Sequence, residues 1–137
     1  MKAGNEDVTR ETQRQVRHLQ ESGWYHSMDW PTGEVTHGLQ SLETQRERLA
    51  RFPIPPDLTG KSVLDIGAWD GWFGFELERR GATLSAIDVV ENPRYLAARR
   101  RMGSKADYRV LDICDPKVLE LGPFDIVLFF GVLYHVK

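Results

Sequence analysis

The amino-acid sequence predicts an α/β fold with a doubly wound parallel sheet that is truncated after its fourth strand. Two observations lead to this class. From residue 61 onward, apolar segments of strand length alternate with segments of helical character. Each apolar segment is followed directly by Asp or Gly, and such residues suit a ligand site at the carboxyl edge of a parallel sheet.

The strands are expected at four positions: Ser62–Ile66, Thr83–Ile87, Tyr108–Leu111 and Phe124–Phe130. Their runs of Val, Leu, Ile and Phe are typical of strands buried on both faces. Three helices are expected between them: Trp72–Arg80, Pro93–Met102 and Pro116–Leu121. Gly81 follows the first helix and Pro93 opens the second, which are the usual positions of these residues at helix ends.

The N-terminal part, residues 1–56, is interpreted as a helical leader and cover, and residues 57–137 as the core domain. Trp24 and Trp30 precede a Pro-Thr-Gly turn, which suggests either a lid or a plain cover for one end of the core. A helix is expected from Leu39 to Phe52, with Gln45 largely off its apolar face, and Pro53 ends it.

Composition excludes several other classes of protein. The 137 residues are 41% hydrophobic and 28% charged with a net charge of −2, which argues against a disordered chain. Cys114 is the single cysteine, so no internal disulfide can form, and we expect it to be buried. The longest apolar run, Ile126–Tyr134, is too short to span a membrane. We therefore expect a cytoplasmic protein without a membrane partner.

Basic residues are concentrated between Glu91 and Arg109, a segment that contains six Lys and Arg but only two acidic residues. Such a run is most often a solvated helix face, and the alternative is a surface for an anionic partner.

The loop after the first strand has the features of a ligand-binding turn. Gly67 and Gly71 permit a tight strand-to-helix connection, and the helix that follows offers free N–H groups to a carboxylate or phosphate. Asp88 lies 21 residues after Gly67, a spacing suited to an acid that accepts ribose hydroxyls. A nucleoside-containing ligand is therefore expected here.

A dinucleotide is disfavoured because its pyrophosphate requires glycine where this loop has Trp69. Asp65 suits a ligand with a cationic end. S-adenosyl-L-methionine, which carries an adenosine, an ammonium and a sulfonium but no phosphate, fits better than NAD or FAD. No metal-ligating set is singled out.

The segment Val63–Gly71, with the letters VLDIGAWDG, resembles motif I of class I S-adenosylmethionine-dependent methyltransferases. Phe129–His135 and the leader residues Trp24-Tyr25-His26 and Thr36-His37-Gly38 resemble one branch, the tRNA wobble-uridine 5-oxyacetic acid methyltransferase-like proteins. The resemblance implies a Rossmann-like fold of about seven strands and transfer of a methyl group.

The resemblance also implies the site residues. Asp65 and the loop would hold the methionine part of the cofactor, Asp88 the ribose, and Asp112 with the Ile113 backbone the adenine. The complete cofactor-binding set is Asp65, Gly67, Ala68, Trp69, Asp70, Gly71, Asp88, Val89, Asp112, Ile113 and Gly131. His135 is the candidate base, with Tyr134 beside it. Asp65 as a cap, Asp112 in a helix N-cap cluster, and plain packing of Tyr134 and His135 stay open as alternatives.

The methyl acceptor is unidentified. The branch's carboxymethyl-transferring members carry a Lys- and Gly-rich stretch where this chain has residues 51–56, so a small molecule is favoured over tRNA. The chain ends after the fourth strand, which leaves an apolar edge at Ile126–Phe130. We therefore expect either self-association through that edge or a fragment of a longer protein, and the alternative function is an incomplete, non-catalytic cofactor-binding module.

Overall fold

The computed structural model describes residues 9–10, 13–14 and 23–130. Within them, the N-terminal part forms β1 (Met28–Asp29), β2 (Val35–Thr36) and α2 (Leu42–Ala50). The rest forms, in chain order, β3 (Ser62–Ile66), α3 (Trp72–Arg79), β4 (Thr83–Asp88), α4 (Pro93–Met102), β5 (Asp107–Val110), the 3-10 helix η1 (Pro116–Glu120) and β6 (Ile126–Leu128).

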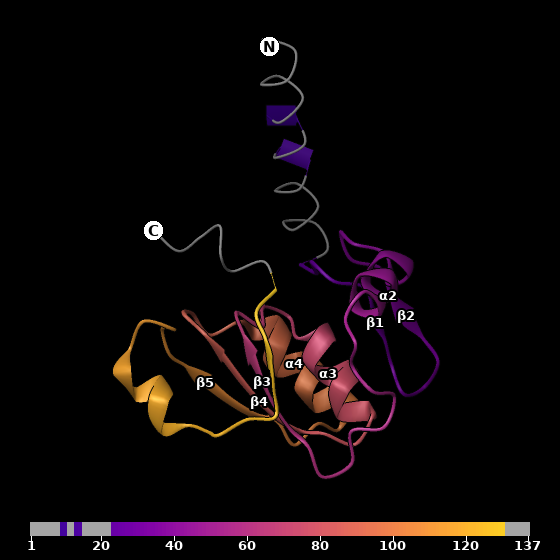
Figure 1. Cartoon of the computed structure of the whole chain (residues 1–137). Coiled ribbons are helices and arrows are strands. Elements are labelled where there is room, and N and C mark those ends of the chain that lie inside the picture. Colours follow the sequence, from indigo (N-terminus) through magenta and orange to yellow (C-terminus); the bar gives the residue numbers. More distant parts are fainter. Residues whose placement is uncertain (1–8, 11–12, 15–22, 131–137) are drawn as a thin grey trace.

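The central sheet is parallel and has the strand order β5-β4-β3-β6 (Figure 1). The first two strands of this sheet along the chain, β3 and β4, are therefore central, and the order reverses between β3 and β6. This arrangement confirms the predicted doubly wound α/β class. The bounds of β3 and α4 are as predicted, whereas β6 is shorter than Phe124–Phe130 because only Ile126–Leu128 pair with β3.

The two faces of the sheet bury different side chains. Val63 and Leu84 face α3 and α4, where Trp72, Phe75 and Tyr95 are almost completely buried. Leu64 and Ile87 belong to a second cluster, which the segment around η1 covers with Leu111, Ile113, Val118, Leu121 and Phe124. The alternation of these residues along each strand follows from the period of two in β structure.

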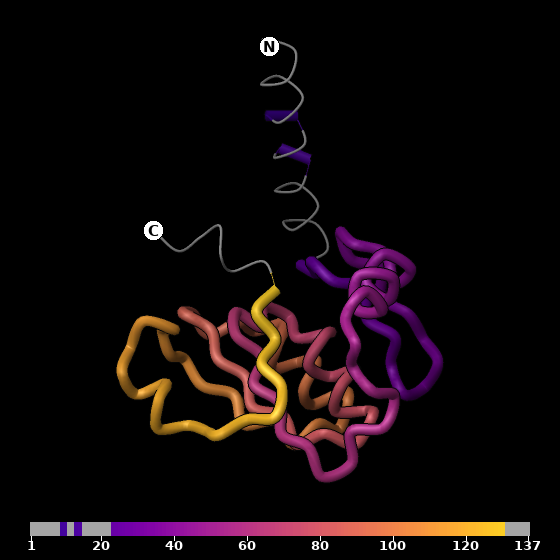
Figure 2. Tube along the Cα trace, in the orientation of Figure 1, coloured from indigo at the N-terminus to yellow at the C-terminus, as the bar shows by residue number. Residues whose placement is uncertain are grey.

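The N-terminal part packs against α3, on the side of the sheet away from η1 (Figure 2). Met28, Trp30 and Leu49 share one apolar cluster with Trp72 and the central strands. Trp30 is only 4% exposed, so this tryptophan covers the core.

Gln45 of α2 is fully buried, whereas the sequence predicts it largely off the buried face of the helix. Its amide oxygen accepts the Ser27 N–H at 2.7 Å, and its amide nitrogen donates to the Ser27 carbonyl at 3.0 Å. Because both ends of the amide are paired with backbone groups, the cost of burying it is offset.

Cys114 also departs from expectation, because it is exposed. It lies in a turn where the Asp112 side chain accepts the Cys114 N–H at 2.8 Å, ahead of η1. Among the described residues, no helix has the length and apolar character needed to cross a membrane.

The carboxylate of Asp29 connects the N-terminal hairpin to both α2 and α3. It accepts hydrogen bonds from Trp72 Nε1 at 2.9 Å, from the Arg79 guanidinium at 3.0 Å, and from Arg46 at 3.0 Å. Partial burial opposes ionisation, but the bonds from Arg79 and Trp72 outweigh it and lower the pKa of Asp29 to about 2.

We predict that Asp29→Asn lowers the free energy of unfolding by about 2 kcal/mol at neutral pH. When folding lowers the pKa of a carboxylate, the group stabilises the fold at a pH above its pKa in the unfolded chain. This stabilisation is lost as the pH falls through the pKa in the folded chain. The difference from the parent chain should therefore shrink between about pH 4 and pH 2. Urea unfolding at several pH values measures it. Glu34→Gln is the control, because the exposed Glu34–Arg101 pair contributes under about 1 kcal/mol; equal losses in both variants would contradict the prediction.

Candidate cofactor site

The β3–α3 loop turns sharply at the carboxyl edge of the sheet. Three of its residues have left-handed backbone conformations: Gly67 with φ 68°, Trp69 with φ 55° and Gly71 with φ 95°. The Gly67 N–H donates to the Ile87 carbonyl at 2.9 Å, and the Gly71 N–H donates to the Ala68 carbonyl at 2.9 Å. These bonds hold the loop against the end of β4 and aim the first turn of α3 at this edge.

Trp69 is the one described non-glycine residue with a positive φ. The left-handed conformation costs an L-residue roughly 1–2 kcal/mol. The Trp69 N–H donates to Asp88 Oδ2 at 2.9 Å, which helps to hold this conformation, and the side chain is 42% exposed. The indole therefore lies at the surface of the loop, beside the groups that would meet a ligand.

Asp88 ends β4 and faces the loop. Its second oxygen, Oδ1, accepts the Val89 N–H at 2.8 Å, and the residue is only 7% exposed. A carboxylate has about four acceptor positions, so two positions remain for hydroxyl groups of a ligand. Val89 is 60% exposed at the same edge and offers an apolar surface next to them.

Asp65 lies at the other side of the loop, on β3, and is 5% exposed. Gly71 is the N-cap of α3 but has no side chain, and the Asp65 carboxylate accepts the Gly74 N–H in its place. The predicted capping alternative is thus present in the structure. Burial, together with the nearby carboxylates of Asp88 and Asp70, raises the pKa of Asp65 to about 8.

Asp70 is fully buried and faces the N-terminal part of the chain. Its Oδ2 atom accepts the Tyr25 and His26 backbone N–H groups at 2.8 and 2.9 Å, and its Oδ1 atom pairs with His26 Nδ1. The direct partners of the Asp70 side chain are thus in the cover. Its assignment to the cofactor stays a prediction.

The remaining predicted residues are more peripheral. Asp112 is exposed just after β5 and accepts the Cys114 N–H, while Asp115 caps η1 by accepting the Lys117 N–H. Ile113 is half-buried and packs with the cluster under η1. Gly131, Tyr134 and His135 lie outside the described residues.

Sequence reasoning missed His26 as a partner of the loop. The two residues of the pair are separated by 44 positions, so no local pattern joins them. The available signal is the Trp-Tyr-His sequence at the start of the cover, which belongs to the segment that resembles the tRNA-modifying branch.

Together, the strand order and the glycine-containing loop define a Rossmann-like domain of the kind used by class I S-adenosylmethionine-dependent methyltransferases. The family model named "Methyltransferase domain" matches residues 64–137, more than half of the chain. The chain therefore belongs to the methyltransferase domain family.

Curated relatives support this membership. The chain is 34% identical to the magnesium-protoporphyrin O-methyltransferase of Rhodobacter capsulatus over 61% of this chain and 38% of the relative. It is 35% identical to a ubiquinone biosynthesis O-methyltransferase of Pseudomonas entomophila over 58% of this chain and 35% of the relative. It is 31% identical to the tRNA U34 carboxymethyltransferase of Aeromonas hydrophila over 82% of this chain and 37% of the relative.

The chain thus spans between a third and two fifths of the length of these relatives. The tRNA-modifying relative matches over 121 residues, more than residues 64–137 contain, so that match extends into the N-terminal part. The likeness to this branch includes the cover as well as the loop.

We predict that Gly71→Ala lowers the free energy of unfolding by about 2–4 kcal/mol. Gly71 has φ 95°, and an added Cβ would lie 2.6 Å from ring atoms of both Phe75 and Tyr95. Gly33→Ala is the matched control, since Gly33 has φ 89° and its Cβ would meet no described atom within 4 Å. Its loss should be about 1 kcal/mol. Thermal unfolding compares the two, and equal losses would show that the packing around Gly71 is looser than described.

We also predict that Asp65→Asn stabilises the fold at neutral and mildly alkaline pH, by about 1–3 kcal/mol at pH 8. When folding raises the pKa of a carboxyl group, the group stabilises the fold fully at a pH below its pKa in the unfolded chain. This stabilisation is lost as the pH rises through the pKa in the folded chain. The gain should therefore vanish below about pH 4. Unfolding curves across this pH range test the sign, and a variant that is less stable at pH 8 would refute it.

Proposed function

We propose that this chain binds S-adenosyl-L-methionine at the β3–α3 loop and that the protein transfers its methyl group to a small-molecule acceptor. The observation that carries the proposal is the placement of Asp88. Its carboxylate lies at the end of the strand next to the loop, is held by the Trp69 and Val89 N–H groups, and retains acceptor positions for a ribose diol.

The charge at this edge suits a cation. Asp88 lies close enough to Asp65 to raise the pKa of Asp65, so a positive charge added between the two carboxyl groups would be favourable. The first turn of α3 offers N–H groups suited to the carboxylate of the methionine part. When bound, the cofactor supplies an electrophilic methyl group, and the bonding electron pair stays on its sulfur.

The acceptor is proposed to be a small molecule because much of the basic run is engaged within the chain. Arg101 pairs with Glu34 at 3.1 Å and lies 4.2 Å from the centre of the Trp30 ring. Arg109 pairs with Asp107 at 3.0 Å. Arginines held by intramolecular partners are less available to phosphate groups, so this surface offers little support for tRNA binding.

We predict that Asp88→Ala raises the dissociation constant for S-adenosylmethionine and for S-adenosylhomocysteine by about 10- to 100-fold, because a pair of charge-assisted hydrogen bonds is lost. Isothermal titration calorimetry measures both ligands. Glu91→Ala is the control, because it removes an exposed acid three positions along the chain. Unchanged affinity in Asp88→Ala would move the ribose elsewhere, and binding of NADH in preference to both ligands would overturn the proposed function.

A further inference from the structure

His26 and Asp70 form a buried pair beside the candidate cofactor loop. The Asp70 carboxylate is fully buried, and it accepts three N–H groups: two from the backbone of Tyr25 and His26 and one from His26 Nδ1. Since a carboxylate has no proton to donate, Nδ1 carries the hydrogen of this bond. In the neutral imidazole the other ring nitrogen, Nε2, is then left with its lone pair.

The second nitrogen of His26 is available for chemistry. Nε2 makes no hydrogen bond with any residue in the described part of the chain. The side chain is 10% exposed, and Nε2 is not among the described side-chain nitrogens and oxygens that are buried without a hydrogen-bond partner. A histidine held by a carboxylate at one nitrogen, with the other nitrogen open, has the arrangement of a general base.

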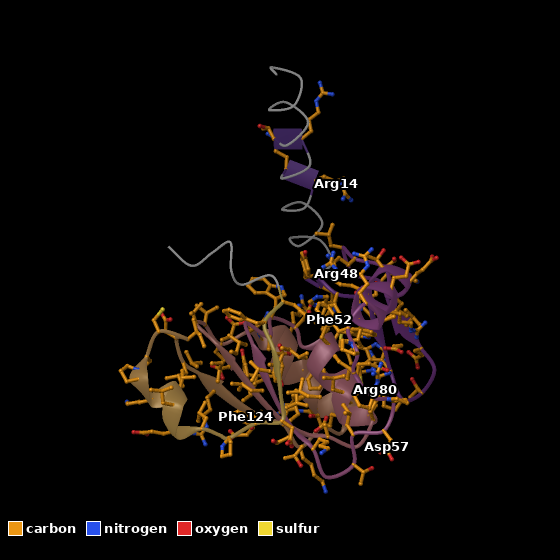
Figure 3. The ribbon with its side chains drawn as sticks, viewed as in Figure 1. Arg14, Arg48, Phe52, Asp57, Arg80 and Phe124 are labelled. Carbon is orange, nitrogen blue, oxygen red and sulfur yellow. The ribbon has the colours of Figure 1, made fainter. Side chains whose placement is uncertain are left out.

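Aromatic rings extend from His26 towards the end of β6. The His26 ring packs edge-to-face with Tyr25 at 4.9 Å and with Phe73 at 5.3 Å between ring centres. Phe73 contacts Phe130 at 4.9 Å, and Phe130 contacts Phe52 at 5.0 Å. Phe52 is 45% exposed and lies where α2 meets the end of β6, at the edge opposite Asp57 (Figure 3). Phe73 is buried, so this row is an apolar wall beside the imidazole that reaches the surface at Phe52.

We propose that His26 is the general base of the methyl transfer and that the acceptor is an aromatic small molecule with an ionisable hydroxyl group, a phenol being the simplest case. This inference rests on the proposed function and deepens it. Nε2 accepts the hydroxyl proton, and the oxygen keeps that electron pair and forms the bond to the methyl carbon. The imidazolium then releases the proton to water.

Asp70 is a positioning residue in this scheme, because it acts through His26. The charged groups near the imidazole are Asp70 on the loop and, behind it, Asp65 on β3, whose pKa Asp70 helps to raise. The side chains that α3 and the segment after β6 contribute to the aromatic row, Phe73 and Phe130, are apolar. The negative carboxylate stabilises the imidazolium as it forms.

The first experiment compares His26→Asn with His37→Asn in the full chain. Asparagine at position 26 can still donate an N–H to Asp70, so the cover stays in place, but it has no basic nitrogen. His37 is an exposed histidine of the same segment and serves as the matched control. With phenol as acceptor, kcat/KM should fall by about 10²- to 10⁴-fold in His26→Asn only. With a nitrophenol that is already ionised at the assay pH, the fall should be slight.

Calorimetry with S-adenosylhomocysteine on the same variants separates the two proposals. Intact binding with lost phenol methylation supports His26 as the base, whereas absent binding in the parent chain overturns the proposed function itself. An equal loss with both phenols, or none, overturns the base assignment. If the parent chain binds the cofactor but methylates no phenol, the acceptor class is wrong.

The second experiment does not depend on turnover. Long-range ¹H–¹⁵N correlation spectra of the histidine rings report which nitrogen carries the proton. We expect His26 to show a protonated Nδ1 and a bare Nε2 at neutral pH, and Asp70→Asn to disturb this tautomer while His37 is unaffected. A His26 ring protonated at Nε2, or at both nitrogens, would overturn the base assignment whatever the activity.

Discussion

The buried carboxylate of Asp70 is the constraint on which the arrangement of the site depends. Burying an ionised group is costly unless hydrogen bonds compensate it, and here three N–H groups of the N-terminal part do so. The bonds join the start of the cover to the glycine-containing loop. They therefore determine where His26 and Tyr25 lie relative to β3 and α3. A substitution that removes this acceptor would break the bonds that join the cover to the loop.

The carboxyl edge of the sheet shows the conflict between stability and ligand binding. Asp65, Asp70 and Asp88 converge there, and no described basic side chain forms an ion pair with Asp65 or Asp88. Asp70 is compensated by the cover and Asp88 by two backbone N–H groups. Asp65 has one N–H from α3 and a pKa raised to about 8. The gathered carboxylates thus carry a cost in the free protein, and the proposed binding of a cationic ligand would offset it.

Much of the fold could be predicted because its signals are local. The apolar runs predicted the β3 and β4 strands, Pro93 predicted the start of α4, and the spacing from Gly67 placed Asp88 opposite the loop. The burial of Gln45 and the pairing of His26 with Asp70 could not be predicted, because each depends on a contact between distant segments that compensates a buried polar group. The short length of β6 likewise depends on its register with β3 rather than on its own apolar run.

The cover is held from two sides, which links its position to both the loop and α4. Asp70 binds it from the loop, while the guanidinium groups of Arg94 and Arg101 lie 5.6 and 4.2 Å from the ring centres of Trp24 and Trp30. Any ligand that moves the β3–α3 loop therefore acts on His26 through Asp70, against a cover that α4 holds in place. The reach of the tRNA-modifying relative's match into this segment is consistent with a cover that belongs to the site. Under the two proposals, cofactor binding and the orientation of His26 would be coupled through the Asp70 carboxylate.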